Sequence, residues 1–175
     1  ELAALKIHEM TEMPPLFCEL NESLIRDGDL DPANLMSWHP RLLDELHVFD
    51  MISSVTWGSA DGRGLWLARY SDGEFYFDVK DDIESMVMNE WRLNDDGSLP
   101  EEPTNSFELE LRSRPWYRIP VENGIGSWTN PYIWAGGDDA VKPTIGVSFG
   151  LPLYMDDGGL IGVIDADFQL GDLDE

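Results

Sequence analysis

The spacing of hydrophobic residues in the first fifty positions predicts two helical segments. Leucines and aromatic residues recur at helical intervals over residues 16–24 and again over residues 35–49. Three interruptions are expected here: a break at Pro14-Pro15, where two backbone N–H donors are missing, a turn at Asp27-Gly28-Asp29, and a kink at His39-Pro40. Residues 1–50 are therefore interpreted as N-terminal helices that lead into the rest of the chain.

After the helical region, the hydrophobic period shortens to that of β-strands. Runs rich in β-branched and aromatic residues over 52–57, 65–70 and 75–79 predict three strands. Turns at Asp61-Gly62 and Asp72-Gly73 separate these runs, and Asp-Gly turns are typical of hairpins. The three strands are therefore expected to form an antiparallel meander.

The rest of the chain repeats the same turn chemistry. Asp95-Asp96-Gly97 and the segment 156–159 predict two further hairpin turns, each flanked by strands. A short helix is expected within residues 101–117, and closing strands are expected over 144–149 and 160–168. Helices followed by an antiparallel sheet place the chain in the α+β class.

Composition limits the size and the partners of the protein. With 175 residues, 42% of them hydrophobic, the chain can bury one substantial core. Its formal net charge of -24 repels nucleic-acid phosphates and anionic lipids, so nucleic acid is not an expected partner. This acidity indicates a salty environment or a need for solubility, and attraction of a cationic ligand is the alternative. Cys18 is the only cysteine, which excludes an intramolecular disulfide.

One motif suggests an enzyme. Gly146-Val147-Ser148-Phe149-Gly150 matches the G-x-S-x-G pattern of serine hydrolases, in which a helix follows the serine and a histidine follows later in the chain. Here Pro152 and an Asp-Gly turn follow instead, and no histidine occurs after His47. The sequence therefore argues against catalysis, with a hydrolase at Ser148 as the enzymatic alternative.

Metal binding has little support in the sequence. Asp27, Asp29 and Asp31 imitate the start of a calcium-binding loop, but Pro32 occupies the glycine position and Trp38 the position of the bidentate glutamate. The three histidines lack the spacing of zinc ligands: His8, His39 and His47. No metal and no cofactor are predicted.

The strongest candidate for chemistry is a binding site. Arg114-Pro115-Trp116-Tyr117, the segment Trp128–Tyr132 and Asp165-Ala166-Asp167 supply a guanidinium, aromatic rings with polar atoms, and carboxylates. Such groups bind the anionic end of a small ligand, exclude water around it, and bind an amine. The alternative is that the rings belong to the core and that the arginine stands at a helix end.

These three segments, together with the strand 147–154, the Asp156-Asp157-Gly158 turn and the closing 162–167 stretch, resemble the Cache family. Cache domains are extracytoplasmic, PAS-like ligand-sensing domains of bacterial chemoreceptors, histidine kinases and nucleotide cyclases. The resemblance implies a PAS-like antiparallel sheet over residues 51–172, preceded by a long helical lead-in. It also implies one structural domain, whose membrane-proximal module, transmembrane helices and output domain lie outside this sequence.

The resemblance also implies which residues bind the ligand. In amino-acid-binding members, the matching positions are these: Arg114, Trp116, Tyr117, Tyr132 and Asp167. Asp165 lies on the same strand face as Asp167. Trp128 is a further candidate because of its ring and indole N–H, and not because of the resemblance. Those members carry a tyrosine shortly before the arginine, where Leu109 stands here, so the expected ligand is an amino acid, an amine or a small carboxylate.

The resemblance places the domain in the periplasm, as part of a protein anchored in the inner membrane. Ligand binding would signal to a kinase, a cyclase or a chemotaxis output, and the N-terminal helix would form a homodimer. The alternative is a PAS-like module that dimerises and binds no ligand.

Overall fold

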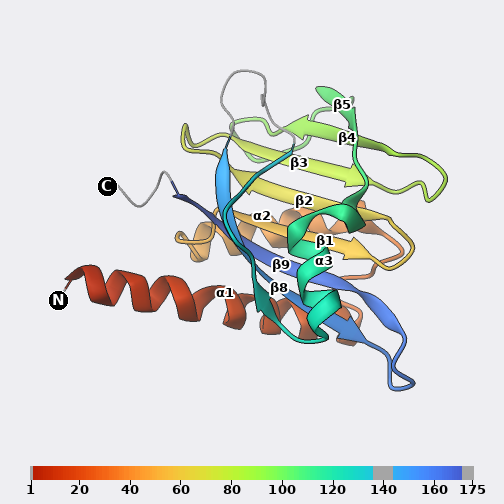
Figure 1. Cartoon of the computed structure of the whole chain (residues 1–175). Coiled ribbons are helices and arrows are strands. Elements are labelled where there is room, and N and C mark those ends of the chain that lie inside the picture. Colours follow the sequence, from red (N-terminus) through yellow and green to blue (C-terminus); the bar gives the residue numbers. More distant parts are fainter. Residues whose placement is uncertain (1, 136–143, 171–175) are drawn as a thin grey trace.

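The strands of the chain form one antiparallel sheet, and helices lie on both of its faces (Figure 1). The computed structural model describes residues 2–135 and 144–170. The helices are α1 (Leu2–Asp27), α2 (His39–Val48) and α3 (Pro115–Asn123), with the 3₁₀ turns η1 (Leu35–Trp38) and η2 (Leu111–Ser113). The strands are β1 (Ser54–Ser59), β2 (Gly64–Arg69), β3 (Phe75–Lys80), β4 (Val87–Arg92), β5 (Asn105–Glu108), β6 (Ser127–Trp128), β7 (Tyr132–Ile133), β8 (Ile145–Tyr154) and β9 (Leu160–Gln169).

Helix α1 continues through its two prolines, so the break expected at Pro14-Pro15 is wrong. Each proline removes one helical hydrogen bond. Packing offsets this loss, because Pro14, Phe17 and Cys18 are buried and α1 lies against β8 and β9. The expected turn after α1 is confirmed: Gly28 has a left-handed φ of 83°, a conformation that glycine adopts without strain.

The kink expected at His39-Pro40 is also wrong. Helix α2 begins at His39, and Pro40 lies in its first turn, where a helix makes no use of a backbone N–H donor. The proline therefore starts a helix. The apolar face of α2 includes Leu42 and Leu46, which are fully buried against the sheet.

The sheet contains the predicted meander. Among the described residues, nine strands pair antiparallel in the order β5-β4-β3-β2-β1-β9-β8-β6, and β7 also pairs with β8. The turn glycines Gly62, Gly73 and Gly158 all have positive φ and join successive strands, as the Asp-Gly pattern predicts. The Asp95-Asp96-Gly97 turn also forms, but the next pairing begins only at Asn105.

The short helix expected within residues 101–117, before Pro115, is confirmed only as a single 3₁₀ turn. This stretch forms β5, in which Phe107 pairs with Met88 of β4, and then the single turn η2. Phe107, Leu109 and Leu111 alternate with polar residues, which suits a strand edge better than a helix face. The helix begins only at Pro115, because proline is well suited to a first helical turn.

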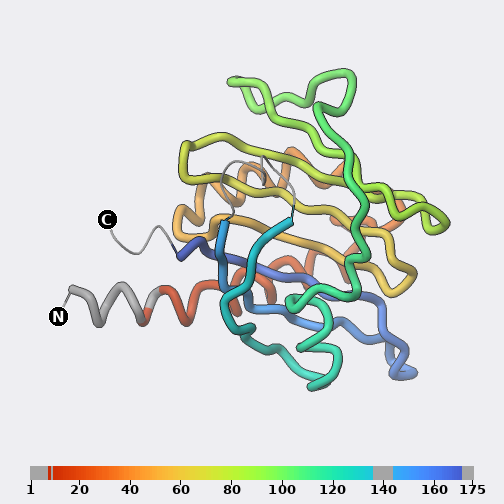
Figure 2. The backbone as a smooth tube through the Cα atoms, turned by 45° about the horizontal axis from the view of Figure 1, so that its top comes forward, coloured from red at the N-terminus to blue at the C-terminus, as the bar shows by residue number. Residues whose placement is uncertain are grey.

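Two layers cover the sheet. Helices α1 and α2 cover one face, and the chain from η2 through α3 to β7 crosses the other (Figure 2). The predicted α+β class, with an antiparallel sheet after a long N-terminal helix, is confirmed. The division at residues 50 and 51 stays a prediction, and the predicted end at residue 172 lies outside the described residues.

Glycines let α3 approach the sheet closely. A Cβ atom at Gly58 would lie 2.7 Å from the Trp116 ring and 2.8 Å from the Tyr117 ring. A Cβ at Gly150 would lie 2.5 Å from the Trp116 carbonyl oxygen. The first turn of α3 therefore rests directly on strand backbone, and this contact fixes the position of Arg114 at its N-cap.

Candidate functional site

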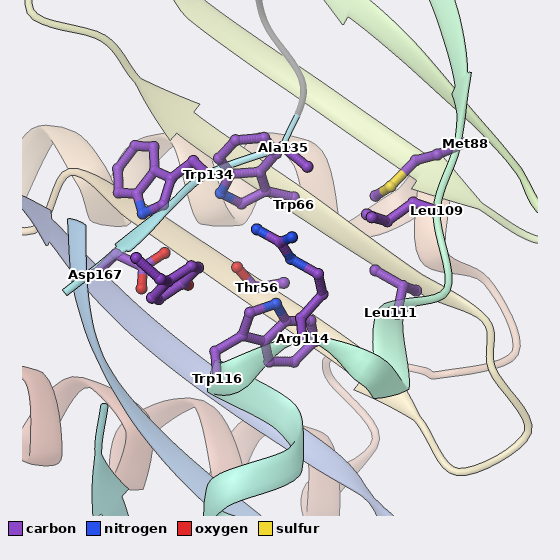
Figure 3. Close-up of a pocket in the computed structure, with 11 residues that line it drawn as sticks. Thr56, Trp66, Met88, Leu109, Leu111, Arg114, Trp116, Trp134, Ala135 and Asp167 are labelled. Atoms are coloured by element: carbon purple, nitrogen blue, oxygen red, sulfur yellow. The ribbon is translucent and has the colours of Figure 1, made fainter. Parts of the chain in front are cut away.

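A small cavity lies between the sheet and the segment that carries α3 (Figure 3). Its volume is about 30 Å³, which is room for roughly one or two water molecules. Eleven residues line it: Thr56, Trp66, Met88, Leu109, Leu111, Arg114, Trp116, Tyr132, Trp134, Ala135 and Asp167. Charged, aromatic and aliphatic groups therefore meet within one confined space.

Four of the seven predicted site residues line this cavity, although they come from three separate parts of the chain. Arg114 and Trp116 lie at the start of α3, Tyr132 on β7 and Asp167 on β9. In Figure 3 the Arg114 side chain extends into the middle of the cavity, and Asp167 lies on the far side of it. The cavity therefore has a cationic and an anionic side.

The Arg114 guanidinium donates a hydrogen bond to a backbone carbonyl and lies near one aromatic ring. Its Nη2 donates to the Ile133 carbonyl oxygen at 2.5 Å, and its Cζ lies 5.5 Å from the centre of the Tyr132 ring. No described carboxylate forms an ion pair with it. A guanidinium has five N–H donors, so Arg114 retains donors that can bind a ligand's carboxylate.

Aromatic rings enclose the charged groups. Trp66 and Trp134 pack edge to face with ring centres 5.5 Å apart, and Trp116 packs against Tyr117 in the same way at 5.6 Å. All four rings are at least nine-tenths buried. The Trp134 Nε1 has no hydrogen-bond partner among the described residues. These rings exclude water, which strengthens electrostatic interactions inside the cavity.

Asp167 is the centre of a hydrogen-bond network. Its Oδ2 accepts from Ser54 Oγ at 2.5 Å, and its Oδ1 accepts from Ser148 Oγ. The Tyr132 hydroxyl lies 2.7 Å from the same Ser148 Oγ. Because an ionised carboxylate only accepts, Ser148 donates to Asp167 and accepts from Tyr132. Each carboxylate oxygen can accept a further bond, so Asp167 retains capacity for an ammonium group.

Burial controls the ionisation of these groups. It raises the pKa of the Asp167 carboxyl to about 6, while hydrogen bonds from Ser148 and Ser54 act in the opposite direction. It also raises the pKa of the Tyr132 phenol well above its usual value, with added contributions from Asp167 and Asp165. The phenol therefore stays protonated at neutral pH and keeps its role as a donor.

Asp165 does not line the cavity. It is fully buried on β9, two residues before Asp167, and its carboxyl lies beside the side chains of Thr56, Ser148 and Asp167. Burial, followed by the proximity of Asp167, raises the pKa of Asp165 well above its usual value. Its carboxyl is therefore not among the groups that line the cavity, and a ligand-binding role for Asp165 stays a prediction.

The remaining two predicted residues point elsewhere. Tyr117 is buried against Gly58, next to Trp116, and does not line the cavity. Trp128 is 36% exposed and packs on Phe149 and Phe168, whose rings are 5.4 and 6.0 Å away. Their ligand-binding roles stay predictions.

Sequence reasoning missed several residues of the site. Trp66 and Trp134 line the cavity, and Ser54 and Thr56 face Asp167 and Asp165 across the β1–β9 pairing. One signal was present: Ser54 and Thr56 alternate with apolar residues in the strand, which indicates a polar face. Trp66 and Trp134 carried no such signal, because sheet pairing and the β7 crossing bring them together.

The hydrolase alternative lacks its geometry. Ser148 lies within the continuous strand β8, not at a strand-to-helix turn, and its hydroxyl is bonded to Tyr132 and Asp167. His39 instead bonds the Gly97 carbonyl near α2. Among the described residues, no group of three or more His, Cys, Asp or Glu side chains has the arrangement of a metal site.

Solved structures with this fold include two chemoreceptor domains. One is the ligand-binding domain of the Pseudomonas aeruginosa PAO1 amino acid chemoreceptor PctC in complex with GABA, 20% identical, with a TM-score of 0.59. The match covers 98% of this chain and 61% of that chain. The other is the ligand-binding domain of the amino acid chemoreceptor PctB from the same organism in complex with L-Gln, 16% identical, with a TM-score of 0.57 and coverage of 98% and 53%. No protein-family model and no curated protein matches the sequence.

These matches show that the chain has the fold of chemoreceptor ligand-binding domains. The resemblance to Cache-type sensor domains is therefore confirmed at the level of the fold. The chain spans about 53–61% of the length of these two structures. At such low sequence identity, these matches establish the fold, and they do not establish the site residues or the ligand.

Proposed function

We propose that this chain is an extracytoplasmic sensor domain that binds an amino acid, an amine or a small carboxylate. The observation that carries the proposal is that Arg114 and Asp167 line the same cavity from opposite sides. The guanidinium has no carboxylate partner among the described residues, and the carboxylate is almost completely buried. A ligand with a carboxylate at one end and an ammonium group at the other would pair with both.

The ligands of the two structures with this fold support the proposal. GABA and L-Gln each carry one ammonium and one carboxylate group. Leu109 lines the cavity on the Arg114 side, where an apolar side chain supplies no donor to a carboxylate. This difference keeps amines and small carboxylates in the proposed ligand class beside amino acids.

The wider context follows from the same proposal. The domain would belong to a receptor anchored in the inner membrane, with its ligand site in the periplasm and a kinase, cyclase or chemotaxis output. The sensor domain itself would catalyse no reaction. None of the helices in the described part of the chain is long and apolar enough to cross a membrane.

Ligand entry requires a conformational change. The cavity holds only about 30 Å³, so the Arg114 side chain, which occupies its middle, has to move when an amino acid enters. Arg114 is bonded to Ile133 of β7, and β7 pairs with β8, which packs on α1. Ligand binding would therefore shift the position of α1 through β7 and β8. This requires that the ligand has different affinities for the conformations before and after the movement of Arg114.

Calorimetry with a ligand panel tests the proposal. The panel includes GABA, L-glutamine, glycine, propylamine and acetate, titrated into the wild type, Arg114→Ala and Asp167→Asn. Loss of a charge-assisted hydrogen bond costs about 1.5–3 kcal/mol. Arg114→Ala should therefore lower the affinity for ligands with a carboxylate, and Asp167→Asn the affinity for ligands with an ammonium group, roughly 10- to 100-fold. Arg118→Ala is the control, because Arg118 lies on the same helix but pairs with Glu122 at the surface. Unchanged affinity in Arg114→Ala and Asp167→Asn would contradict the site assignment.

The second candidate is a dimerisation module without a ligand. Leu16 and Leu20 lie four residues apart on α1 and are 57% and 36% exposed, so this helix presents apolar surface to solvent. Sedimentation velocity on the wild type and on Leu16→Glu would show whether α1 mediates a homodimer. A dimer combined with no binding from the whole panel would favour this candidate over the sensor.

A further inference from the structure

Asp165 is a buried carboxyl group without a cationic partner among the described residues. Its relative exposure is 0%, and its hydrogen-bonding neighbours, the Thr56 and Ser148 hydroxyls and the Asp167 carboxyl, supply no positive charge. No described lysine, arginine or histidine forms an ion pair with it. An ionised carboxylate in such a place would cost several kcal/mol, so a group of this kind normally takes up a proton.

The described groups around Asp165 supply no positive charge in contact with it. Asp167 follows on the same face of β9, and the Tyr132 phenol approaches from the cavity side. Arg114 lies over the far side of the Tyr132 ring. From the opposite face, α1 presents the buried thiol of Cys18, whose pKa burial raises, so this neighbour is neutral as well.

The other neighbours of Asp165 in the described part of the chain are uncharged. Thr56 of β1 and Gly150 of β8 are its partners in strand pairing, and the Ser148 hydroxyl lies close by. Helix α3 covers Gly150 with the Trp116 backbone and the Pro120 ring. A protonated Asp165 can donate a hydrogen bond to the Asp167 carboxylate or to a hydroxyl oxygen, whereas an ionised one would repel Asp167.

We infer that Asp165 is held as a neutral carboxylic acid, which leaves Asp167 as the single negative charge on the amine side of the cavity. Asp165 is thus a positioning residue that acts through Asp167. The site then matches a ligand with one ammonium group, and a second ammonium group on the ligand would find no counter-charge. The match to a ligand with one ammonium group rests on the proposed function, whereas the protonation of Asp165 concerns the protein alone.

The neutral acid links folding to proton uptake. An aspartate in an unfolded chain has a pKa of about 3.9, so Asp165 is ionised when the protein unfolds at neutral pH and protonated when it is folded. The unfolding equilibrium constant of the wild type should therefore increase up to tenfold per pH unit above pH ~5, relative to a variant without this acid. The increase stops where the folded Asp165 itself ionises.

The first test needs no ligand. Urea unfolding of the wild type and Asp165→Asn is measured from pH 5 to pH 8, with Asp44→Asn as the control because Asp44 is an exposed carboxylate on α2. The ratio of unfolding constants between the wild type and Asp165→Asn should grow with pH, up to tenfold per unit, while the ratio for Asp44→Asn stays flat. A constant ratio for Asp165→Asn would overturn the inference.

A second measurement uses only the wild type, so it remains informative if Asp165→Asn fails to fold. Carbon-13 NMR of aspartate-labelled wild type should show one carboxyl signal that stays at the shift of a protonated acid from pH 5 to pH 8, apart from the Asp167 signal, which changes with a pKa of about 6. Signals that are all ionised at pH 7 would overturn the inference as well.

The ligand test uses three probes of equal length at pH 7.5: propylamine, β-alanine and 1,3-diaminopropane. The wild type should bind the two probes with one ammonium group at least tenfold more tightly than the diamine. Asp165→Asn should keep their affinities within about threefold, because an amide reproduces the neutral acid. Asp167→Asn should lose them at least tenfold. Tighter binding of the diamine would overturn the single-charge match.

The two tests separate the inference from the proposed function. If the pH effect is present and none of the three probes binds the wild type, Asp165 is a neutral acid and the proposed ligand class is wrong. If the probes bind and the pH effect is absent, the sensor assignment stands and the neutral-acid inference fails.

Discussion

Tyr132 and Asp167 meet at one hydroxyl group, the Oγ of Ser148. The Tyr132 phenol lies 2.7 Å from this oxygen, and the Ser148 hydroxyl bonds the Asp167 carboxylate. Strand β7, which pairs with β8, is thereby connected to the buried carboxylate of β9. A change in the charge of Asp167 should therefore alter the hydrogen bonding of β7, the strand whose Ile133 carbonyl also binds Arg114.

Replacing Ser148 by alanine should weaken this connection. The substitution leaves both the Tyr132 phenol and one Asp167 oxygen without their partner in a buried environment. Unsatisfied buried groups cost about 1–3 kcal/mol each, so we expect Ser148→Ala to lower the free energy of unfolding by about 2–4 kcal/mol. Urea unfolding measured by tryptophan fluorescence gives this value directly.

Tyr132→Phe is the matched comparison, because it removes the phenol and leaves the Ser148–Asp167 bond. It should cost only about 1 kcal/mol, and adding it to Ser148→Ala should cost less than the sum of the two single changes. Strictly additive effects would show that the three side chains do not act as one network.

Local chemistry explains which parts of the fold could be predicted from the sequence. The turns at Gly62, Gly73 and Gly158 were predicted because their left-handed backbone depends on glycine itself. The breaks at Pro14-Pro15 and Pro40 were wrong, because the cost of a proline depends on its position in the helix and on tertiary packing.

The candidate site shows the same division. Arg114, Trp116, Tyr132 and Asp167 were predicted through a family resemblance, and they line one cavity. The contribution of Trp134 could not be predicted, because its contact with Trp66 depends on the path of β7 across the sheet. Long-range contacts of this kind leave no trace in the spacing of residues along the chain.

The raised pKa of Asp167 predicts a specific pH dependence of stability. Because folding raises this pKa from about 3.9 to about 6, the folded protein binds the proton more tightly. The contribution of Asp167 to stability is therefore full below pH ~4 and falls as the pH rises toward 6. Relative to Asp167→Asn, the wild type should lose about 3 kcal/mol over this window and nothing further above it.

Urea unfolding at half-unit pH steps measures this difference. Asp44→Asn removes one exposed negative charge and serves as the control for the large net charge of the protein. A difference that rises with pH over the same window would mean that Asp167 is stabilised in its ionised form, contrary to the expectation.

Gly58 should be intolerant of any side chain. Its Cβ would lie 2.7 Å from Trp116 and 2.8 Å from Tyr117, so Gly58→Ala has to displace the first turn of α3. Such overpacking costs about 1–3 kcal/mol, and the displacement should also weaken ligand binding at Arg114. Gly158→Ala is the comparison: its φ of 88° makes alanine unfavourable by about 1 kcal/mol, but space around it is open and the turn is far from the cavity. Equal effects of both variants on binding would contradict the proposed contact.

Exchanging Arg114 for lysine should separate the two sides of the site. Lysine keeps the positive charge but lacks the planar fork of a guanidinium, which can bond the Ile133 carbonyl and a ligand carboxylate at the same time. Calorimetry should therefore show that Arg114→Lys lowers the affinity for β-alanine roughly tenfold. The affinity for propylamine, which has no carboxylate, should stay unchanged. Arg118→Lys on the exposed side of α3 should change neither ligand. If Arg114→Lys weakens propylamine as much as β-alanine, then Arg114 supports the shape of the cavity and does not bind a carboxylate, because only a structural role would affect both ligands alike.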